Sequence, residues 1–262
     1  MNMTFGQFFP GTSPVHRMDP RTKLLLTLGY IIGLFFIHTW FGYVGAVLYL
    51  AMAVFFSRVH IRFLLRALKP MLFIILVTFI LNLFTFTDGS IRFSSENIAK
   101  AFAMAGRLAL LVMGSQLLTL TTSPLALTDA IETMLRPLKR LRFPVHELAM
   151  MMSIALRFIP ILLDEAQRII QAQKSRGADF ETGNLFRRAR ALVPLLVPLF
   201  VSAFRRADEL AIAMEARCYR GDVGRTRMKE LRFTGIDCYG LLTGLLSVAW
   251  IMLDRLVIEA FL

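Results

Sequence analysis

The sequence is poor in charge and almost free of cysteine. Asp, Glu, Lys and Arg make up 18% of its 262 residues and hydrophobic residues 56%, whereas an ordinary soluble domain is about 25% charged. This balance argues against intrinsic disorder and against a single soluble globular domain. Two cysteines, Cys218 and Cys238, are too few for a disulfide scaffold.

Sequence motifs of catalysis and of nucleotide binding are missing as well. The chain has no GxxxxGK[ST], HExxH, GxSxG or CxxC pattern. Its four histidines are scattered over different segments, which is poor geometry for a metal ion. The sequence therefore predicts no catalytic residue and no metal site in this chain.

Long runs without charge are what the chain does have. No Asp, Glu, Lys or Arg occurs from Leu24 to Ser57, a stretch of 34 residues that suits two membrane spans joined by a turn at Thr39–Gly42. Three further spans are predicted within Pro70–Thr87, Ala101–Thr122 and Ile236–Val257. The expected fold class is an all-α integral membrane protein, with about five transmembrane helices plus a cytoplasmic coupling domain of long amphipathic helices.

The distribution of positive charge predicts the orientation. Lys and Arg outnumber Asp and Glu by 30 to 18, and the excess lies before the first span, between the second and third spans, and in a long section before the last span. Positive loops mark the cytoplasmic side. We therefore expect a multi-pass protein of the cell inner (cytoplasmic) membrane, with a cytoplasmic N-terminal segment at 1–23, four spans in 24–122, cytoplasmic coupling helices in 123–235 and a fifth span in 236–262.

Helical periodicity dominates the section 123–235. It predicts helices over Leu127–Leu141, Val145–Arg176 and Asn184–Arg217. One face of the first long helix is apolar, and the second long helix contains a pair of prolines that predict a kink. The residues singled out on these faces are Leu148, Met151, Met152, Ala155, Phe158, Ile159, Leu162, Pro194 and Pro198. Such faces can lie along a membrane, bind partner proteins or pack on each other; their area looks larger than one helical hairpin hides from water.

The two long helices end in a related way, in Ser175-Arg176-Gly177 and in Ala216-Arg217-Cys218. A cation at a helix C-terminus is stabilised by the last carbonyl groups and the helix dipole, which is one explanation for each end. Two such ends would also project two guanidinium groups at one end of the helical pair. A guanidinium makes bidentate bonds to carboxylates, so these ends suit a joint with a partner protein.

At this point the sequence resembles the transmembrane T component (EcfT/CbiQ-like) of energy-coupling factor (ECF) transporters, the vitamin-importing branch of the ABC transporters. The resemblance runs nearly end to end, and the segments that carry it are GQFFPGTSPVHRMDPRTKLLL, RFIPILLDEAQRIIQAQKSRG, AMEARCYRGDVGRTRMKEL and the final span. The helix ends match the family's paired X-Arg-Gly signature. The second end departs from it at Cys218, where Gly is expected, and Gly tolerates a positive φ more readily than Cys.

The resemblance implies a scaffold that binds no substrate and no cofactor and hydrolyses no ATP. Two ABC-type ATPase subunits, which hold ATP and magnesium, would dock on Arg176 and Arg217 with the flanking Ser175, Gly177, Ala216 and Cys218. The apolar faces, including Pro194 and Pro198, would contact one or more membrane-embedded S components that capture the vitamin or other micronutrient. The N-terminal segment resembles the forms that many S components share, which favours a shared module.

Two other classes of function stay open on the residues alone. A stand-alone membrane transporter or channel would bind substrate in its own spans, where Asn82, Arg107 and Gln116 are the polar candidates. Arg107 has the alternatives of snorkelling toward the membrane surface, of pairing with Asn82 or of pairing with a backbone carbonyl. A membrane enzyme would need a carboxylate cluster, for which Asp164–Glu165 and Asp208–Glu209 are the candidates. The net charge of +12 is explained by orientation, so no nucleic-acid partner is expected.

Overall fold

The computed structural model describes residues 8–37, 39–83, 85–87, 90–92, 95–141, 144–178, 184–219, 221 and 233–261, and nearly all of them are helical. The chain separates into two compact units. One consists of Met1–Met134 with Lys229–Leu262, and the other of Leu135–Met228. The long apolar helices confirm the predicted all-α membrane fold class, to which the structure adds one small β-hairpin.

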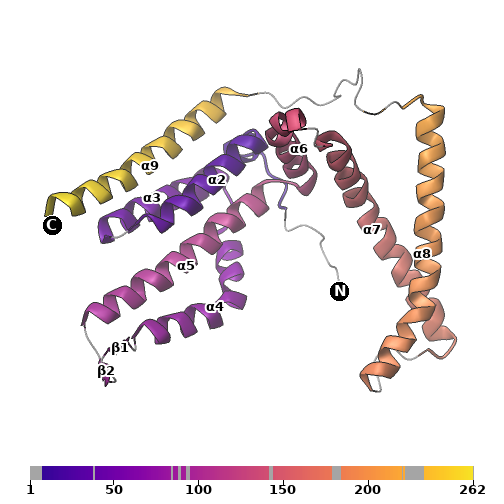
Figure 1. Cartoon of the computed structure of the whole chain (residues 1–262), viewed down its shortest axis with the longest axis horizontal. Coiled ribbons are helices and arrows are strands. Elements are labelled where there is room, and N and C mark those ends of the chain that lie inside the picture. Colours follow the sequence, from indigo (N-terminus) through magenta and orange to yellow (C-terminus); the bar gives the residue numbers. More distant parts are fainter. Residues whose placement is uncertain are drawn as a thin grey trace. The chain divides into compact units, whose positions relative to one another are not determined.

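The first unit holds most of the apolar helices (Figure 1). In chain order they are α1 (Pro14–Arg17), α2 (Pro20–Phe35), α3 (Trp40–Ser57), α4 (Ile61–Leu83), the antiparallel strands β1 (Thr85–Thr87) and β2 (Ser90–Arg92), α5 (Ser95–Thr121), α6 (Pro124–Leu135) and α9 (Gly235–Phe261). Helix α2 contacts α9, α5 and α3, and α4 packs along α5. The fully buried side chains of Leu34, Ile37 and Leu64 belong to the core between these helices.

Among the described residues, five helices are long and apolar enough to cross a membrane. They are α3, α4, Asn97–Thr121 of α5, α7 (Val145–Ser175) and Gly235–Asp254 of α9. Four of them coincide with predicted spans. The set includes α7, which the charge pattern assigned to the cytoplasm, and omits α2, whose 16 residues reach about 24 Å against a hydrocarbon core of about 30 Å.

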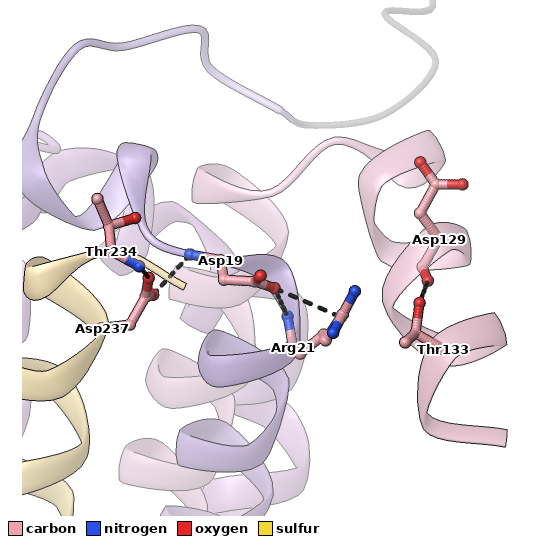
Figure 2. Close-up of polar contacts among 6 residues, drawn as sticks. All are labelled: Asp19, Arg21, Asp129, Thr133, Thr234 and Asp237. Carbon is pink, nitrogen blue, oxygen red and sulfur yellow. Dashed lines mark hydrogen bonds and ion pairs between the residues drawn. The ribbon is translucent and has the colours of Figure 1, made fainter. Parts of the chain in front are cut away.

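Two buried aspartates of α9 hold the starts of α2 and α3. Asp237 accepts hydrogen bonds from the backbone N–H groups of Thr234 and of Asp19, the N-cap residue of α2, each at 2.7 Å (Figure 2). Asp254 accepts from the N–H groups of Thr39, the N-cap residue of α3, at 3.3 Å and of Gly42 at 3.0 Å. Helix N-termini have N–H groups without intrahelical partners and attract negative charge. Each carboxylate therefore ties one helix start to α9.

The turn between α2 and α3 lies earlier than the predicted Thr39–Gly42, because α2 ends at Phe35 and α3 begins at Trp40. The reason is tertiary. Asp254 caps the helix that starts at Trp40, and on the other side the guanidinium of Arg107 donates a 2.6 Å hydrogen bond to the carbonyl of Ile37. The pairing of Arg107 with a backbone carbonyl, one of its predicted alternatives, is confirmed.

Two further helix boundaries differ from the sequence prediction. Helix α4 begins at Ile61, nine residues before the predicted Pro70, since Leu64 is buried in the core and draws the basic segment into the helix. A single helix was expected over Leu127–Leu141. The structure has α6 up to Leu135 and then the 3₁₀ helix η1 (Arg136–Leu141). The ring of Pro137 would clash with the carbonyl four residues earlier in a continued α-helix, which favours the end of α6 at Leu135.

Glycines allow α9 to approach α3 closely. A Cβ atom on Gly45 of α3 would come within 2.3 Å of the Trp250 ring, so only glycine fits there without moving that ring. Trp250 in turn stacks on Phe41 with a centroid distance of 4.4 Å, and its indole N–H donates to the carbonyl of Phe41 at 3.1 Å. At this point the close contact between α3 and α9 requires a glycine at position 45.

Candidate functional site

The candidate site lies in the second unit, on α7 and α8 (Leu185–Ala216). The predicted helices Val145–Arg176 and Asn184–Arg217 are confirmed to within one residue at each end. Pro144 is the N-cap residue of α7, where a missing N–H costs nothing because the first N–H groups lack helical partners. Helix α8 continues through Pro194 and Pro198, and the predicted kink stays a prediction.

The C-termini of α7 and α8 have the same backbone geometry. In α7 the N–H of Gly177 donates to the carbonyl of Lys174 at 3.0 Å, and the N–H of Ala178 donates to that of Gln173 at 2.9 Å. In α8 the N–H of Cys218 donates to the carbonyl of Glu215 at 2.9 Å and that of Tyr219 to the carbonyl of Met214 at 3.0 Å. This pair of bonds defines a Schellman cap, with an arginine at the C-cap of each helix.

Cys218 takes the backbone conformation that the family signature assigns to glycine. Its φ is 54°, against 84° for Gly177 at the equivalent position of α7. The left-handed region costs a residue with a Cβ atom roughly 1–2 kcal/mol. With Cys218 in place of glycine the cap therefore still forms, but it is less favourable. The sequence alone did not decide whether the cap would form.

The guanidinium groups of Arg176 and Arg217 are exposed, and among the described residues neither has an ion-pair partner. The sequence led us to expect both groups at one end of the helical pair, and this prediction is wrong. Helix α8 returns past α7 after the connection that follows Ser175, so the two C-termini lie at opposite ends of the pair (Figure 1). The pair thus presents two separated cationic tips.

A polar contact joins α7 to α8 at their crossing. The carboxylate of Glu165 accepts a hydrogen bond from the hydroxyl of Ser202 and another, at 3.2 Å, from the guanidinium of Arg206. We call these three residues the crossing contact. The sequence analysis named Glu165 as part of a candidate carboxylate pair; in the structure its side chain contacts α8. The sequence feature that could have predicted this contact is an acidic residue on α7 and a basic residue on α8, each within an otherwise apolar helix face.

The crossing contact lies midway between the two cationic tips. Arg176 follows Glu165 by eleven residues along α7, and Arg217 follows Arg206 by eleven residues along α8. At 1.5 Å per residue each arm is about 16 Å long.

The predicted contact face for a membrane partner is exposed over its first half. Leu148, Met151 and Met152 are 38%, 54% and 53% exposed, and Ala155 is exposed as well. Phe158, Ile159 and Leu162, nearer the crossing, are half-buried. On α8 the prolines Pro194 and Pro198 are exposed, together with large apolar side chains at Leu192, Val193, Leu196, Val197, Phe200, Val201 and Phe204.

The two carboxylate pairs, Asp164–Glu165 and Asp208–Glu209, are not gathered into one cluster in the described part of the chain. Among the described residues no group of three or more His, Cys, Asp or Glu side chains is placed to hold a metal ion. Asp164, Asp208 and Glu209 are exposed, and Glu165 is engaged in the crossing contact.

Comparison with known proteins places the chain in a family. Residues 11–229 match the family model described as "Cobalt transport protein" (CbiQ). An energy-coupling factor transporter transmembrane protein EcfT from Ruminiclostridium cellulolyticum is 53% identical over 98% of this chain and 98% of its own length. Proteins of the same name are 49% identical in Thermosediminibacter oceani (95% of this chain, 97% of the relative) and 45% identical in Lactococcus lactis (90% and 91%). The chain therefore belongs to the CbiQ family of transport proteins, together with these EcfT transmembrane proteins of energy-coupling factor transporters.

Proposed function

We propose that this chain couples two ABC-type ATPase subunits to a membrane-embedded S component, for the ATP-driven uptake of vitamins or other micronutrients. One observation carries the proposal: α7 and α8 end in matched Schellman caps, each with an exposed arginine at the C-cap. ATP and magnesium would be held by the ATPase subunits. The chain itself would supply the mechanical connection.

Each cationic tip suits a groove that contains carboxylates. A guanidinium at a helix C-cap is held close to the turning backbone, and its five N–H groups form a planar fork that binds a carboxylate with two parallel bonds. Since the tips lie at opposite ends of the helical pair, they would engage two separate grooves. That arrangement fits a pair of ATPase subunits better than it fits one.

The exposed apolar faces of α7 and α8 would hold the S component. Burial of apolar area stabilises a contact by about 25 cal/mol per Å², and contiguous exposed apolar patches mark protein or membrane interaction sites. Residues from Leu148 to Ala155 of α7 and from Leu192 to Phe204 of α8 form such patches. Movement of the ATPase subunits would reach these patches through the crossing contact.

We also propose that α2, and not α7, completes the set of membrane spans. Helix α2 packs inside the first unit against α3, α5 and α9, and a short span is accommodated by local thinning of the bilayer. Helix α7 pairs with α8 through the charged Glu165–Arg206 contact, and both helices carry several charged residues. The N-terminus and the coupling helices would then be cytoplasmic, as the basic loops predict.

The test removes the two guanidinium groups and leaves the helices intact. We expect the single variants Arg176→Ala and Arg217→Ala to weaken ATPase binding roughly thirtyfold or more, since truncating one partner of a hydrogen-bonded charge pair typically costs about 2–5 kcal/mol. Binding is measured by recovery of the ATPase subunits with the tagged chain from native membranes in mild detergent. Substrate uptake is measured in the same cells. Arg168→Ala, which removes another exposed arginine of α7, is the matched control and should change neither quantity.

Two results would overturn the proposal. The first is normal uptake and normal ATPase recovery in the double variant. The second is transport by the purified chain alone in liposomes, which would point back to a stand-alone transporter.

A further inference from the structure

The first turns of α4 carry three cations on one face. Arg62, Arg66 and Lys69 are spaced by four and then three residues, so they lie one above the other along the helix. All three are exposed. Leu64, on the opposite side of the helix, is 1% exposed and belongs to the core. The face formed by these three cations, which we call the basic face, therefore points away from the core of the first unit.

The charges of the basic face are available to a ligand. Among the described residues none of the three side chains has an ion-pair partner. The guanidinium of Arg66 lies 6.0 Å from the centroid of the Phe63 ring, a contact that occupies none of its N–H groups in a hydrogen bond. No Asp or Glu occurs between Asp19 and Asp88 in the sequence. An anion would therefore meet no neighbouring carboxylate of α3 or α4.

Further along α4 the same face becomes apolar. Phe73, Val77 and Ile80 continue the spacing of the three cations and are 72%, 37% and 42% exposed. Pro70 lies between the two parts, and the helix is continuous through it. One uninterrupted helix face thus has positive charge at its beginning and exposed apolar side chains beyond it.

The change from basic to apolar lies at the depth of lipid headgroups. The charge-free run Pro70–Thr87 has 18 residues, which suits one membrane span of about 20. Cations directly before such a run lie at the boundary between hydrocarbon and water. From Lys69 to Ile80 the helix rises about 16 Å, close to half of a hydrocarbon core of about 30 Å. The apolar part of the face therefore has the length of the acyl chains of one leaflet.

We propose that this face of α4 binds an anionic membrane lipid. Arg62, Arg66 and Lys69 would contact the phosphate oxygens, and the acyl chains would lie along Phe73, Val77 and Ile80. A lipid matches both halves of the face at once, whereas a soluble acidic partner would match the cations and leave the apolar half uncovered. The proposal concerns the first unit alone and does not depend on which subunits bind α7 and α8.

The experiment is a native mass spectrometry titration of the full-length chain, with the partners that co-purify, in mild detergent. Three probes are compared: phosphatidylglycerol, phosphatidylcholine with the same acyl chains, and inorganic phosphate. We expect phosphatidylglycerol to bind about fivefold more weakly to Arg62→Gln and to Arg66→Gln than to the parent chain, because each variant loses one charged contact with the lipid. Arg168→Gln removes an exposed arginine from α7 and should bind as the parent does.

A second variant separates a lipid site from general attraction by positive charge. Ile61→Arg combined with Arg62→Ile keeps the composition and the net charge, and it moves one guanidinium by about 100° around the helix axis. Both positions are exposed, so the exchange leaves the core untouched. We expect the double variant to bind phosphatidylglycerol about fivefold more weakly than the parent, as Arg62→Gln does.

Preferential binding of phosphatidylglycerol over phosphatidylcholine that is weakened in the two single variants and in the double variant supports the proposal. Parental affinity in the double variant overturns it, because net charge alone would then explain the binding. Equal binding of the two lipids by the parent chain also overturns it. Displacement of phosphatidylglycerol by millimolar inorganic phosphate overturns it as well, since the basic face would then be a site for a soluble anion.

Discussion

Cys218 and Gly177 occupy equivalent positions in two caps but differ in what the left-handed backbone costs them. The Cβ atom of Cys218 is unfavourable at φ 54°, whereas Gly177 at φ 84° has none. A side chain added at Gly177 would meet no atom within 4 Å, so only its backbone conformation opposes substitution there. The geometry of each arginine tip thus depends on a single residue after it.

We predict that Cys218→Gly stabilises the C-terminus of α8 by about 1 kcal/mol and that Gly177→Ala destabilises the C-terminus of α7 by a similar amount. Hydrogen exchange of the amides of Cys218, Tyr219, Gly177 and Ala178 measures the effect locally. Exchange should become slower in Cys218→Gly and faster in Gly177→Ala. Slower exchange in both variants would contradict the shared cap geometry.

His16, which lies outside the membrane helices, gives the N-terminal segment a dependence on pH. Its ring is held by the hydroxyl of Ser13 at 2.6 Å and the carbonyl of Phe9 at 3.0 Å. Burial lowers the imidazole pKa below the usual 6.5; the charge of Lys23 adds to this and the carbonyl of Phe9 opposes it. The folded state therefore binds fewer protons than the unfolded state just below pH 6.5.

We predict that the neutral His16 ring contributes fully to the stability of the folded chain above pH 6.5. This contribution declines as the pH falls through the lowered pKa of His16. Thermal unfolding of the parent chain should show a lower Tm at pH 5.5 than at pH 7.5. In His16→Gln the difference should be smaller, because glutamine does not titrate. An imidazole pKa at or above 6.5, measured by NMR titration, would contradict the prediction.

Helix α9 organises the first unit at the scale of elements. Its two buried aspartates cap the N-termini of α2 and α3, and its Trp250 packs against the glycine face of α3. Without α9 both helix starts would lose carboxylate acceptors. A helix near the end of the chain thus positions two helices near its beginning.

We predict that Gly45→Ala destabilises the chain by about 1–3 kcal/mol, the usual cost of overpacking. The added Cβ would push Trp250 out of its stack on Phe41. Trp40 and Trp250 are the two tryptophans of the sequence, so Trp250 fluorescence in a Trp40→Phe background reports the displacement. Gly29→Ala is the control, since nothing lies within 4 Å of its added Cβ; similar fluorescence in the two alanine variants would contradict the close approach.

At the scale of the whole molecule, the exposed apolar area of the second unit is larger than its helix pair hides by itself. Leu148 to Ala155 on α7 and Leu192 to Phe204 on α8 leave large side chains uncovered. Apolar area of this size needs lipid or a protein partner to cover it. The proposed S component would provide that cover.

We predict that Ala155→Glu and Leu162→Glu reduce recovery of the S component at least tenfold, since a charge without a partner in an apolar contact costs several kcal/mol. Recovery is measured by mass spectrometry of the proteins that co-purify with the tagged chain. ATPase recovery should stay unchanged, which separates this surface from the arginine tips. Unchanged recovery of small hydrophobic membrane proteins with both variants would exclude this face.

The sequence predicted best what depends on neighbouring residues. Helices α7 and α8 were predicted to within a residue because their apolar periodicity and the flanking Pro144 and Gly177 act locally. The charge-free runs located α3, α4, α5 and α9 because a membrane core excludes charged side chains. The start of α4 was missed because the buried position of Leu64 depends on packing that no local pattern encodes.

The family and the identity of the two arginine tips were determined by the sequence alone, since both rest on short motifs and on residue spacing. Only the tertiary structure decided that the tips lie at opposite ends of the helical pair, that Glu165 turns inward to Arg206, and that Asp237 and Asp254 cap helices more than 200 residues earlier in the chain. The physical reason is that a helix specifies its own length and apolar face, whereas its direction and neighbours depend on contacts between residues far apart in the chain.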